Sequence, residues 1–249
     1  MTRTRLTILA ILALSAIGIG GFFAYDQVLR GDSVAALTLP AATPDASTAA
    51  SSSPSAAPGT STDPLSAAEV AGTWNVASGS EAGYRVRERL ATLSAESDAV
   101  GRTSDVTGSI TVEADGDGAK ATAGTLTVNT QTIASDKRMR DNRLRNEGLQ
   151  TDQYPTATFK LTQSVDIPAS ALSGTATNVT LTGDLTLHGV TKSVQIPAQA
   201  QLAGNQIQVA GSLSFPLSDY QISAPNVGGF VLSISDQGTL EFLVAFAKG

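Results

Sequence analysis

Apolar and polar side chains alternate with a period of two along most of the chain after residue 69. Short runs rich in Thr, Val and Leu are separated by Gly, Asp and Pro, the spacing typical of a meandering antiparallel sheet. The pattern predicts about nine strands, at residues 73–77, 84–90, 106–114, 121–133, 156–167, 178–188, 193–202, 206–215 and 239–247.

The run at residues 178–188 shows how such a strand faces. Its odd positions Val179, Leu181, Leu185 and Leu187 are apolar, whereas its even positions are polar, so one face of the sheet is dry. Because open sheet edges invite aggregation, so many strands must close into a barrel or stack as a sandwich, and periodicity does not choose between them. A barrel of about eight strands has room for packed side chains or for one ligand.

One segment, residues 135–147, breaks the strand pattern. Its sequence, SDKRMRDNRLRNE, lacks β-branched residues, begins with Ser and Asp, and is followed by Gly148. These features predict one short helix with a glycine stop. Tyr154-Pro155 then marks the return to extended chain.

The first residues predict a membrane anchor. Residues 6–24 carry no charge, and these 19 residues would span about 28 Å as a helix. Arg3 and Arg5 precede the run, so the positive-inside rule makes residues 1–5 cytoplasmic, residues 6–25 a single transmembrane span and the rest extracytoplasmic. The alternative is a signal peptide, whose cleavage would release a secreted protein; both alternatives give the same compartment.

The segment after the anchor predicts a stalk. Between residues 40 and 63, 21 of 24 residues are Ala, Ser, Thr or Pro, and such a composition buries too little apolar surface to offset the entropy of ordering. We therefore expect a flexible stalk at residues 26–68 and one folded domain at residues 69–249.

Composition removes several classes of function. The net charge of −6 opposes binding to nucleic acid. With no cysteine and with His188 as the single histidine, a zinc site is not expected. The turn at residues 115–118 lacks the remaining ligands of a calcium loop. No nucleophile elbow or phosphate-binding loop is found. We expect a protein that is not an enzyme and that has no metal and no cofactor. The alternative is a catalytic pair of carboxylates that the fold brings together from distant positions in the sequence.

Three motifs in one order resemble the YceI-like family: RDNRLRNEGLQTDQYPTATF at residues 140–159, LTGDLTLHGVTKSVQIP at residues 181–197 and NVGGFVLSISDQGTLEF at residues 226–242. The resemblance covers the domain from about Gly72 to the end. It implies an all-β, lipocalin-like antiparallel β-barrel with one short helix, located outside the cytoplasm in bacteria, whose elongated apolar interior holds a polyisoprenoid chain. This chain differs in its predicted anchor from many relatives, which are soluble periplasmic proteins, and the anchor argues against free shuttling between membranes.

Two sets of residues are candidates for ligand contact. A dry tube for an isoprenoid tail is expected from apolar barrel positions, each of which could equally be ordinary core. These positions are Val86, Leu126, Val128, Phe159, Leu161, Leu185, Leu187, Val194, Ile196, Phe215, Phe242 and Val244.

The second set is basic, because five of nine residues between Lys137 and Arg145 carry a positive charge in an acidic protein. Arg140, Arg143 and Arg145 are candidates for holding a phosphate head group or an anionic lipid surface. The alternative is a solvated helix face with local pairing.

Two functions follow from these observations. The first is a membrane-tethered binding protein that sequesters, stores or presents an isoprenoid-type lipid, such as an isoprenoid quinone or a polyprenyl phosphate. The second is a cell-envelope stress or interaction domain whose barrel is filled by side chains.

Overall fold

The computed structural model describes residues 34–40, 65–91, 96–224 and 231–249. The predicted cytoplasmic N-terminus and transmembrane anchor lie outside these residues, and the predicted stalk is described only at residues 34–40 and from residue 65 onward. Within the described ranges, every helix is too short or too polar to cross a bilayer.

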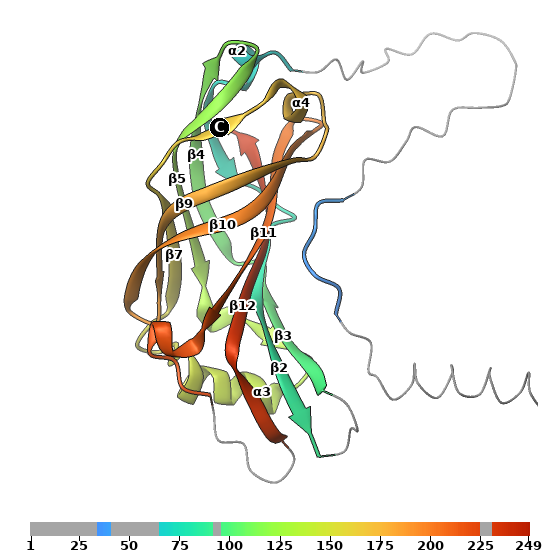
Figure 1. Cartoon of the computed structure of the whole chain (residues 1–249). Coiled ribbons are helices and arrows are strands. Elements are labelled where there is room, and N and C mark those ends of the chain that lie inside the picture. The colour runs from blue at the N-terminus through green and yellow to red at the C-terminus, as the bar shows by residue number, and fades with distance from the viewer. Residues whose placement is uncertain (1–33, 41–64, 92–95, 225–230) are drawn as a thin grey trace, which may run out of the picture.

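The described residues form one large antiparallel sheet with a few short helical turns (Figure 1). In chain order the elements are α2 (Ala67–Val70), β1 (Gly72–Val76), β2 (Glu81–Leu90), β3 (Glu96–Thr103), β4 (Val106–Asp115), β5 (Gly118–Asn129), η1 (Thr130–Thr132), β6 (Ala134–Ser135), α3 (Arg138–Arg143), η2 (Leu144–Gly148), β7 (Thr156–Leu161), β8 (Val165–Ile167), α4 (Ala169–Leu172), β9 (Thr177–Leu187), β10 (Val190–Ala203), β11 (Gln206–Pro216), η3 (Leu217–Tyr220) and β12 (Val231–Lys248).

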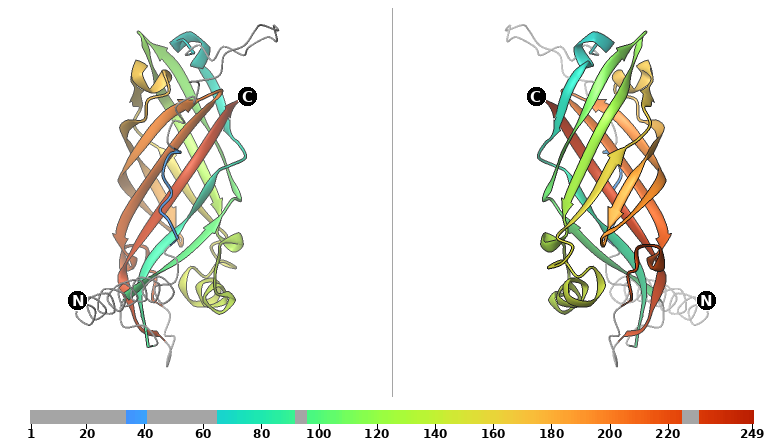
Figure 2. Two further views of the ribbon diagram at one scale, coloured as in Figure 1. Left: turned by 90° about the vertical axis from the view of Figure 1, so that its right-hand side faces the viewer. Right: turned by 90° about the vertical axis from the view of Figure 1, so that its left-hand side faces the viewer.

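The sheet closes on itself as a barrel. The path β1-β4-β5-β7-β9-β10-β11-β12 returns to β1, because β1 pairs with both β4 and β12. The long strands tilt around an elongated barrel, as the two side views in Figure 2 show. The fold is therefore the lipocalin-like antiparallel barrel that the resemblance implied, and not a sandwich.

The two ends of the barrel differ. At one end, α2 and α4 cover the opening, and the buried Trp74 donates its indole N–H to the carbonyl oxygen of Val70 at 2.8 Å. Val112, Leu172 and Phe246 join this packed cluster. At the other end, β2 pairs with the first part of β12, between Val231 and Leu243, and leaves the ring together with β3. Helix α3 lies across their side of the opening (Figure 1). This second end is called the α3 end below.

Most predicted strands are confirmed, and the hairpin turns have the expected chemistry. Gly116 adopts a positive φ of 59° between β4 and β5. His188 and Gly189, with φ of 51° and 75°, form the tight turn between β9 and β10, as a two-residue hairpin requires. His188 Nδ1 lies 3.0 Å from the carbonyl oxygen of Tyr220, a contact that joins this turn to η3.

The prediction missed β3 because its sequence, ESDAVGRT, has few large apolar residues. Its inward-facing Gly101 lies opposite Tyr84, and a Cβ there would come within 2.4 Å of the tyrosine ring. A glycine that weakens the strand pattern in sequence is thus required by the packing of a neighbouring aromatic ring.

Other boundaries also differ from the prediction. Residues 156–167 form two strands, since the amides of Thr162 and Gln163 both donate to the carbonyl oxygen of Thr182 and end β7 there. The final strand begins at Val231 rather than at residue 239, because bulges against β2 interrupt its period. The helix begins at Arg138, three residues later than expected, because Ser135 still pairs with β3.

A candidate ligand-binding tube in the barrel

The barrel is hollow, and its interior consists of two adjoining chambers. The narrow chamber, of about 150 Å³, lies between the ring strands and α4. The wide chamber, of about 430 Å³, lies at the α3 end and falls in the size range of ligand sites, about 300–1,000 Å³. Both are lined by Ala82, Val128, Ala157, Leu185 and Leu240, which form a waist where the chambers meet.

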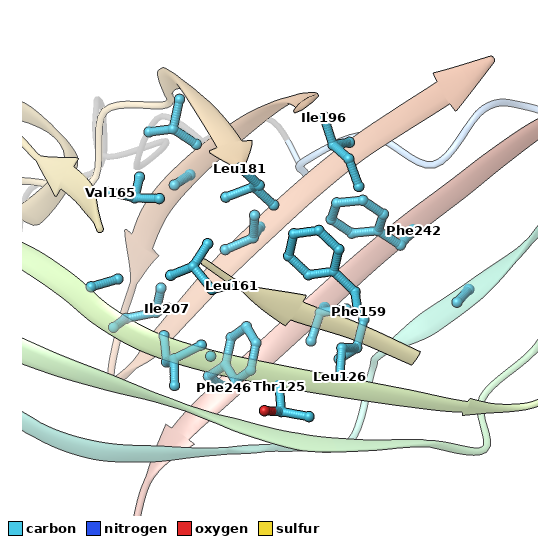
Figure 3. A pocket seen from close by; sticks show the side chains of 18 of the residues that line it. Thr125, Leu126, Phe159, Leu161, Val165, Leu181, Ile196, Ile207, Phe242 and Phe246 are labelled. Carbon is cyan, nitrogen blue, oxygen red and sulfur yellow. The ribbon is translucent and has the colours of Figure 1, made fainter. Parts of the chain in front are cut away.

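The narrow chamber is almost entirely apolar. Figure 3 shows Phe159, Leu161, Leu181 and Phe242 pointing into a common space. Phe159 turns inward where Gly183 faces it, and a Cβ on this glycine would lie 2.5 Å from the phenyl ring. A small residue on β9 therefore faces a large one on the neighbouring strand β7. The wall is closely packed, and the space inside it stays open.

The wide chamber combines an apolar wall with a polar rim. Its wall includes Val86, Ile133 and Leu187, whereas its rim carries the charged Lys137 and Arg143, with the exposed Met139 beside them. Because exposed residues line it, the chamber reaches the molecular surface at the α3 end. A ligand with one apolar tail and one polar end would find its tail site inside and its polar site at this rim.

An ion pair connects α3 to the barrel wall inside the wide chamber. Arg140 Nη2 lies 2.6 Å from Glu88 Oε1, and the Glu88 side chain is 7% exposed. The other terminal nitrogen of Arg140 contacts Asp136 and lies 3.3 Å from Ser135 Oγ. Desolvation on burial opposes the charge of Arg140, but Glu88 and Asp136 outweigh it and raise the pKa of the guanidinium. Arg140 thus remains charged and holds the helix against β2.

Tyr84 places an unused hydroxyl beside this pair. It lines the wide chamber, and its Oη is buried with no hydrogen-bond partner among the described residues. A buried hydroxyl without a partner costs about 1–3 kcal/mol, so it is the natural donor for the polar group of a ligand.

The burial of Tyr84 predicts alkaline instability. Burial raises the pKa of Tyr84 from 10.0 to about 12. Because the folded-state pKa exceeds the unfolded one, this contribution to stability is complete below pH 10 and is lost as the pH rises toward 12. We expect the free energy of unfolding to fall by about 2 kcal/mol across this window. Denaturant titrations of wild type and Tyr84→Phe test this; an equal alkaline loss in both would contradict it.

The predicted lining residues fall almost entirely on the two chambers. The exception is Val194, which packs against the apolar cluster without lining either chamber. The narrow chamber takes Leu126, Phe159, Leu161, Ile196, Phe242 and Val244, the wide chamber takes Val86, Leu187 and Phe215, and Val128 and Leu185 line both. Their contact with a lipid stays a prediction.

The three predicted head-group arginines do not lie together. Arg140 and Arg143 line the wide chamber, whereas Arg145 does not. Arg145 lies in the π-turn η2, and its buried Nε has no hydrogen-bond partner in the part of the chain that the structure describes. Arg143 lies 3.8 Å from Glu147 one turn further along the chain, which agrees with the local pairing left open above.

Sequence reasoning missed Tyr84 and Glu88, the two polar residues that face the chamber from β2. Both occupy the inward positions of a strand whose Val86 was identified correctly. The alternation of side chains along β2 places Tyr84 and Glu88 on the same inner face as Val86. Nothing in the sequence shows that an arginine from a distant helix reaches Glu88. No cluster of metal-ligating side chains occurs in the described part of the chain.

A family model described as YceI-like domain matches residues 74–246. UPF0312 proteins of Vibrio parahaemolyticus and Vibrio cholerae are each 32% identical over 113 residues, which is 43% of this chain and 56% of theirs. The matched segment thus spans about half the length of these curated relatives.

Two solved structures share the fold. A polyisoprenoid binding domain from Saccharophagus degradans, implicated in plant cell wall breakdown, aligns with a TM-score of 0.54 at 18% identity and covers 72% of this chain and 99% of its own. Burkholderia cenocepacia BcnA aligns with a TM-score of 0.51 at 15% identity and covers 68% of this chain and 98% of its own.

Proposed function

The chain belongs to the YceI-like family, and from that premise we propose that its barrel binds one isoprenoid-type lipid along the tube. The observation that carries the proposal is the pair of adjoining apolar chambers, which open to the surface at the α3 end. The shared fold with the polyisoprenoid binding domain from Saccharophagus degradans supports the choice of ligand class.

The shape of the tube favours a long, slender ligand. The two chambers meet at a waist whose residues include the small Ala82 and Ala157, and an extended chain can pass such a constriction where a compact ligand cannot. Each buried methylene contributes about 0.8 kcal/mol, so a tail that fills both chambers gains more than one that fills either alone.

Substituting Arg143 tests whether the rim of the wide chamber binds a phosphate group. Arg143→Gln removes a guanidinium that lines the wide chamber and leaves the Arg140–Glu88 pair in place. Because charge-assisted contacts are worth about 1.5–3 kcal/mol, we expect binding of a polyprenyl phosphate to weaken about tenfold, while binding of the neutral polyprenol is unchanged. Fluorescence titration with both ligands measures the difference, and Lys160→Gln, at an exposed outward position of β7, is the control. Equal loss for both ligands would reject the head-group role.

We further propose that the barrel works outside the cytoplasm of a bacterial cell, tethered by residues 6–25. The charge pattern of residues 1–25 supports the tether and its direction. A protease-protection assay on spheroplasts tests the orientation, since the barrel should be digested from outside. Protection of the barrel would contradict this location.

The proposed role is binding, without catalysis. The polar side chains that line the wide chamber include the Arg140–Glu88 pair and the hydroxyls of Tyr84, Thr130, Ser223 and Thr239. None of these hydroxyls is hydrogen-bonded to a side-chain base among the described residues, so the set offers no activated nucleophile with its base. The rival hypothesis of a barrel packed with side chains is not supported, because an open space of about 430 Å³ remains at the α3 end.

Lipid extraction identifies the bound molecule. The full chain would be purified from its membranes, extracted with organic solvent and examined by mass spectrometry alongside a mock preparation from cells that lack it. We expect one isoprenoid species in near-stoichiometric amount. Recovery of only bulk phospholipid at background level would reject the proposal.

A further inference from the structure

Residues 34–40, here called the strap, lie along the outer wall of the barrel (Figure 2). Arg85 Nη2 donates to the carbonyl oxygen of Val34 at 2.8 Å, and Arg102 donates to the carbonyl oxygen of Ala35. At the other end, Gln201 Nε2 donates to the carbonyl oxygen of Pro40 at 3.3 Å. The strap therefore crosses from β2 and β3 to β10.

The two arginines that hold the strap are themselves fixed. Glu241, only 2% exposed, lies 2.8 Å from Arg102 Nη2 and 3.4 Å from Arg85 Nη2. Arg85 Nη1 also lies 3.1 Å from Asp98. Ion pairs with these acids fix the two guanidinium groups independently of the strap. The arginine N–H groups are therefore preorganised to donate to its carbonyl oxygens.

The strap has a direction along the barrel. Gln201 lies near the end of β10 beside the turn at residues 204–205, whereas Arg85 lies further toward the α3 end, midway along β2. From Pro40 to Val34 the strap thus runs toward the α3 end. Eight residues lie between Tyr25, the last residue of the predicted anchor, and Val34, and a chain of that length reaches at most about 30 Å.

The α3 end carries a surface suited to lipid. Met139 of α3 is 73% exposed and Leu232 at the start of β12 is 62% exposed, and the only other large apolar residue so exposed among the described residues is Val34 of the strap. Lys137 and Arg138 at the start of the helix and Arg89 near the end of β2 are also exposed. Exposed acidic residues, Asp136 and Glu147, lie on the same segment, and each is within 4 Å of a basic side chain. Exposed apolar side chains beside basic ones are typical of a surface that binds an anionic membrane.

We propose that the α3 end docks on an anionic lipid surface, with the strap holding the barrel in that orientation. The apolar tips of Met139 and Leu232 reach the acyl boundary, and the exposed basic residues contact the head groups. The wide chamber opens at the same end, so a lipid can pass between membrane and tube without crossing water. Membrane docking goes beyond lipid binding and does not require an occupied tube. Only the orientation of the barrel on the membrane rests on the proposed tether.

The absence of cysteine makes the test clean. Single-cysteine variants of the full chain would carry an environment-sensitive fluorophore at Met139→Cys or Leu232→Cys, and at Asp117→Cys or Asn205→Cys near the opposite end. Each is mixed with vesicles of phosphatidylglycerol and phosphatidylcholine that contain a spin-labelled quencher lipid. We expect several-fold stronger quenching at positions 139 and 232 than at 117 and 205, falling with added salt.

The strap is tested in the same assay. Leu37→Ser with Leu39→Ser removes its two half-buried side chains, and Ala36→Ser with Thr38→Ser at exposed positions is the matched control. We expect the first pair alone to reduce the difference between the two ends. Three results would each overturn the proposal. These are equal quenching at both ends, failure of the chain to float with vesicles, and burial of the probe at position 139 by self-association in the absence of vesicles.

Discussion

Replacing Ala157 with tryptophan is expected to block the tube and reduce the recovery of a long isoprenoid about tenfold, equivalent to about 1.4 kcal/mol. Ala157 lies at the waist, where it lines both chambers and faces inward from β7. An indole ring there would fill the passage, because an interior surrounded by close-packed walls cannot expand without cost. Lipid extraction from the full-length variant, compared with wild type, measures the effect.

The matched control for the blocked waist is Lys160→Trp. Lys160 is on the same strand but is exposed on the outer face, so this variant adds the same ring without narrowing the tube. Overpacking at Ala157 costs about 1–3 kcal/mol of stability, so thermal unfolding of both variants must show a folded barrel. A short isoprenoid that fits the wide chamber should still bind to Ala157→Trp; unchanged binding of the long chain would contradict the continuous tube.

Removing Arg140 is expected to give the largest loss of stability, about 3 kcal/mol. Arg140→Met leaves the Glu88 carboxylate inside the barrel wall, where its side chain is 7% exposed and loses a partner at 2.6 Å. A buried charge without its partner retains its desolvation cost, so the free energy of unfolding should fall steeply. Chemical denaturation at neutral pH measures it.

A double-mutant cycle separates the ion pair from other effects of the substitution. Glu88→Leu combined with Arg140→Met removes both charges, and we expect most of the lost stability to return. Arg138→Met, at an exposed position of the same helix, should change stability by less than about 0.5 kcal/mol. A double variant as unstable as Arg140→Met alone would show that Glu88 is not the source of the loss.

The inner face of the barrel could be predicted because it follows from local alternation. Leu181, Leu185 and Leu187 share one face of a strand by period alone, and the structure turns all three into the interior. Closure into a barrel could not be read this way, since the pairing of β1 with β12 joins residues from opposite ends of the domain. The family resemblance supplied that step.

The polar part of the site was less predictable for a similar reason. The run of arginines in α3 was visible in sequence, but the partner of each depends on which strand the helix crosses. Arg140 reaches Glu88, 52 residues earlier, whereas Arg145 does not line the chamber. The strap was also missed, because its attachment uses backbone carbonyl oxygens, which every sequence possesses.

Photo-crosslinking with a polyprenol that carries a diazirine near the middle of its chain tests the central claim most directly. After irradiation of the full chain, peptide mass spectrometry would locate the attachment. We predict crosslinks at inward positions around the waist, on Val128, Ala157, Leu185 and Leu240, and their loss in Ala157→Trp. Crosslinks confined to outward residues such as Lys160, or unchanged in the blocked variant, would show that the lipid does not lie inside the barrel.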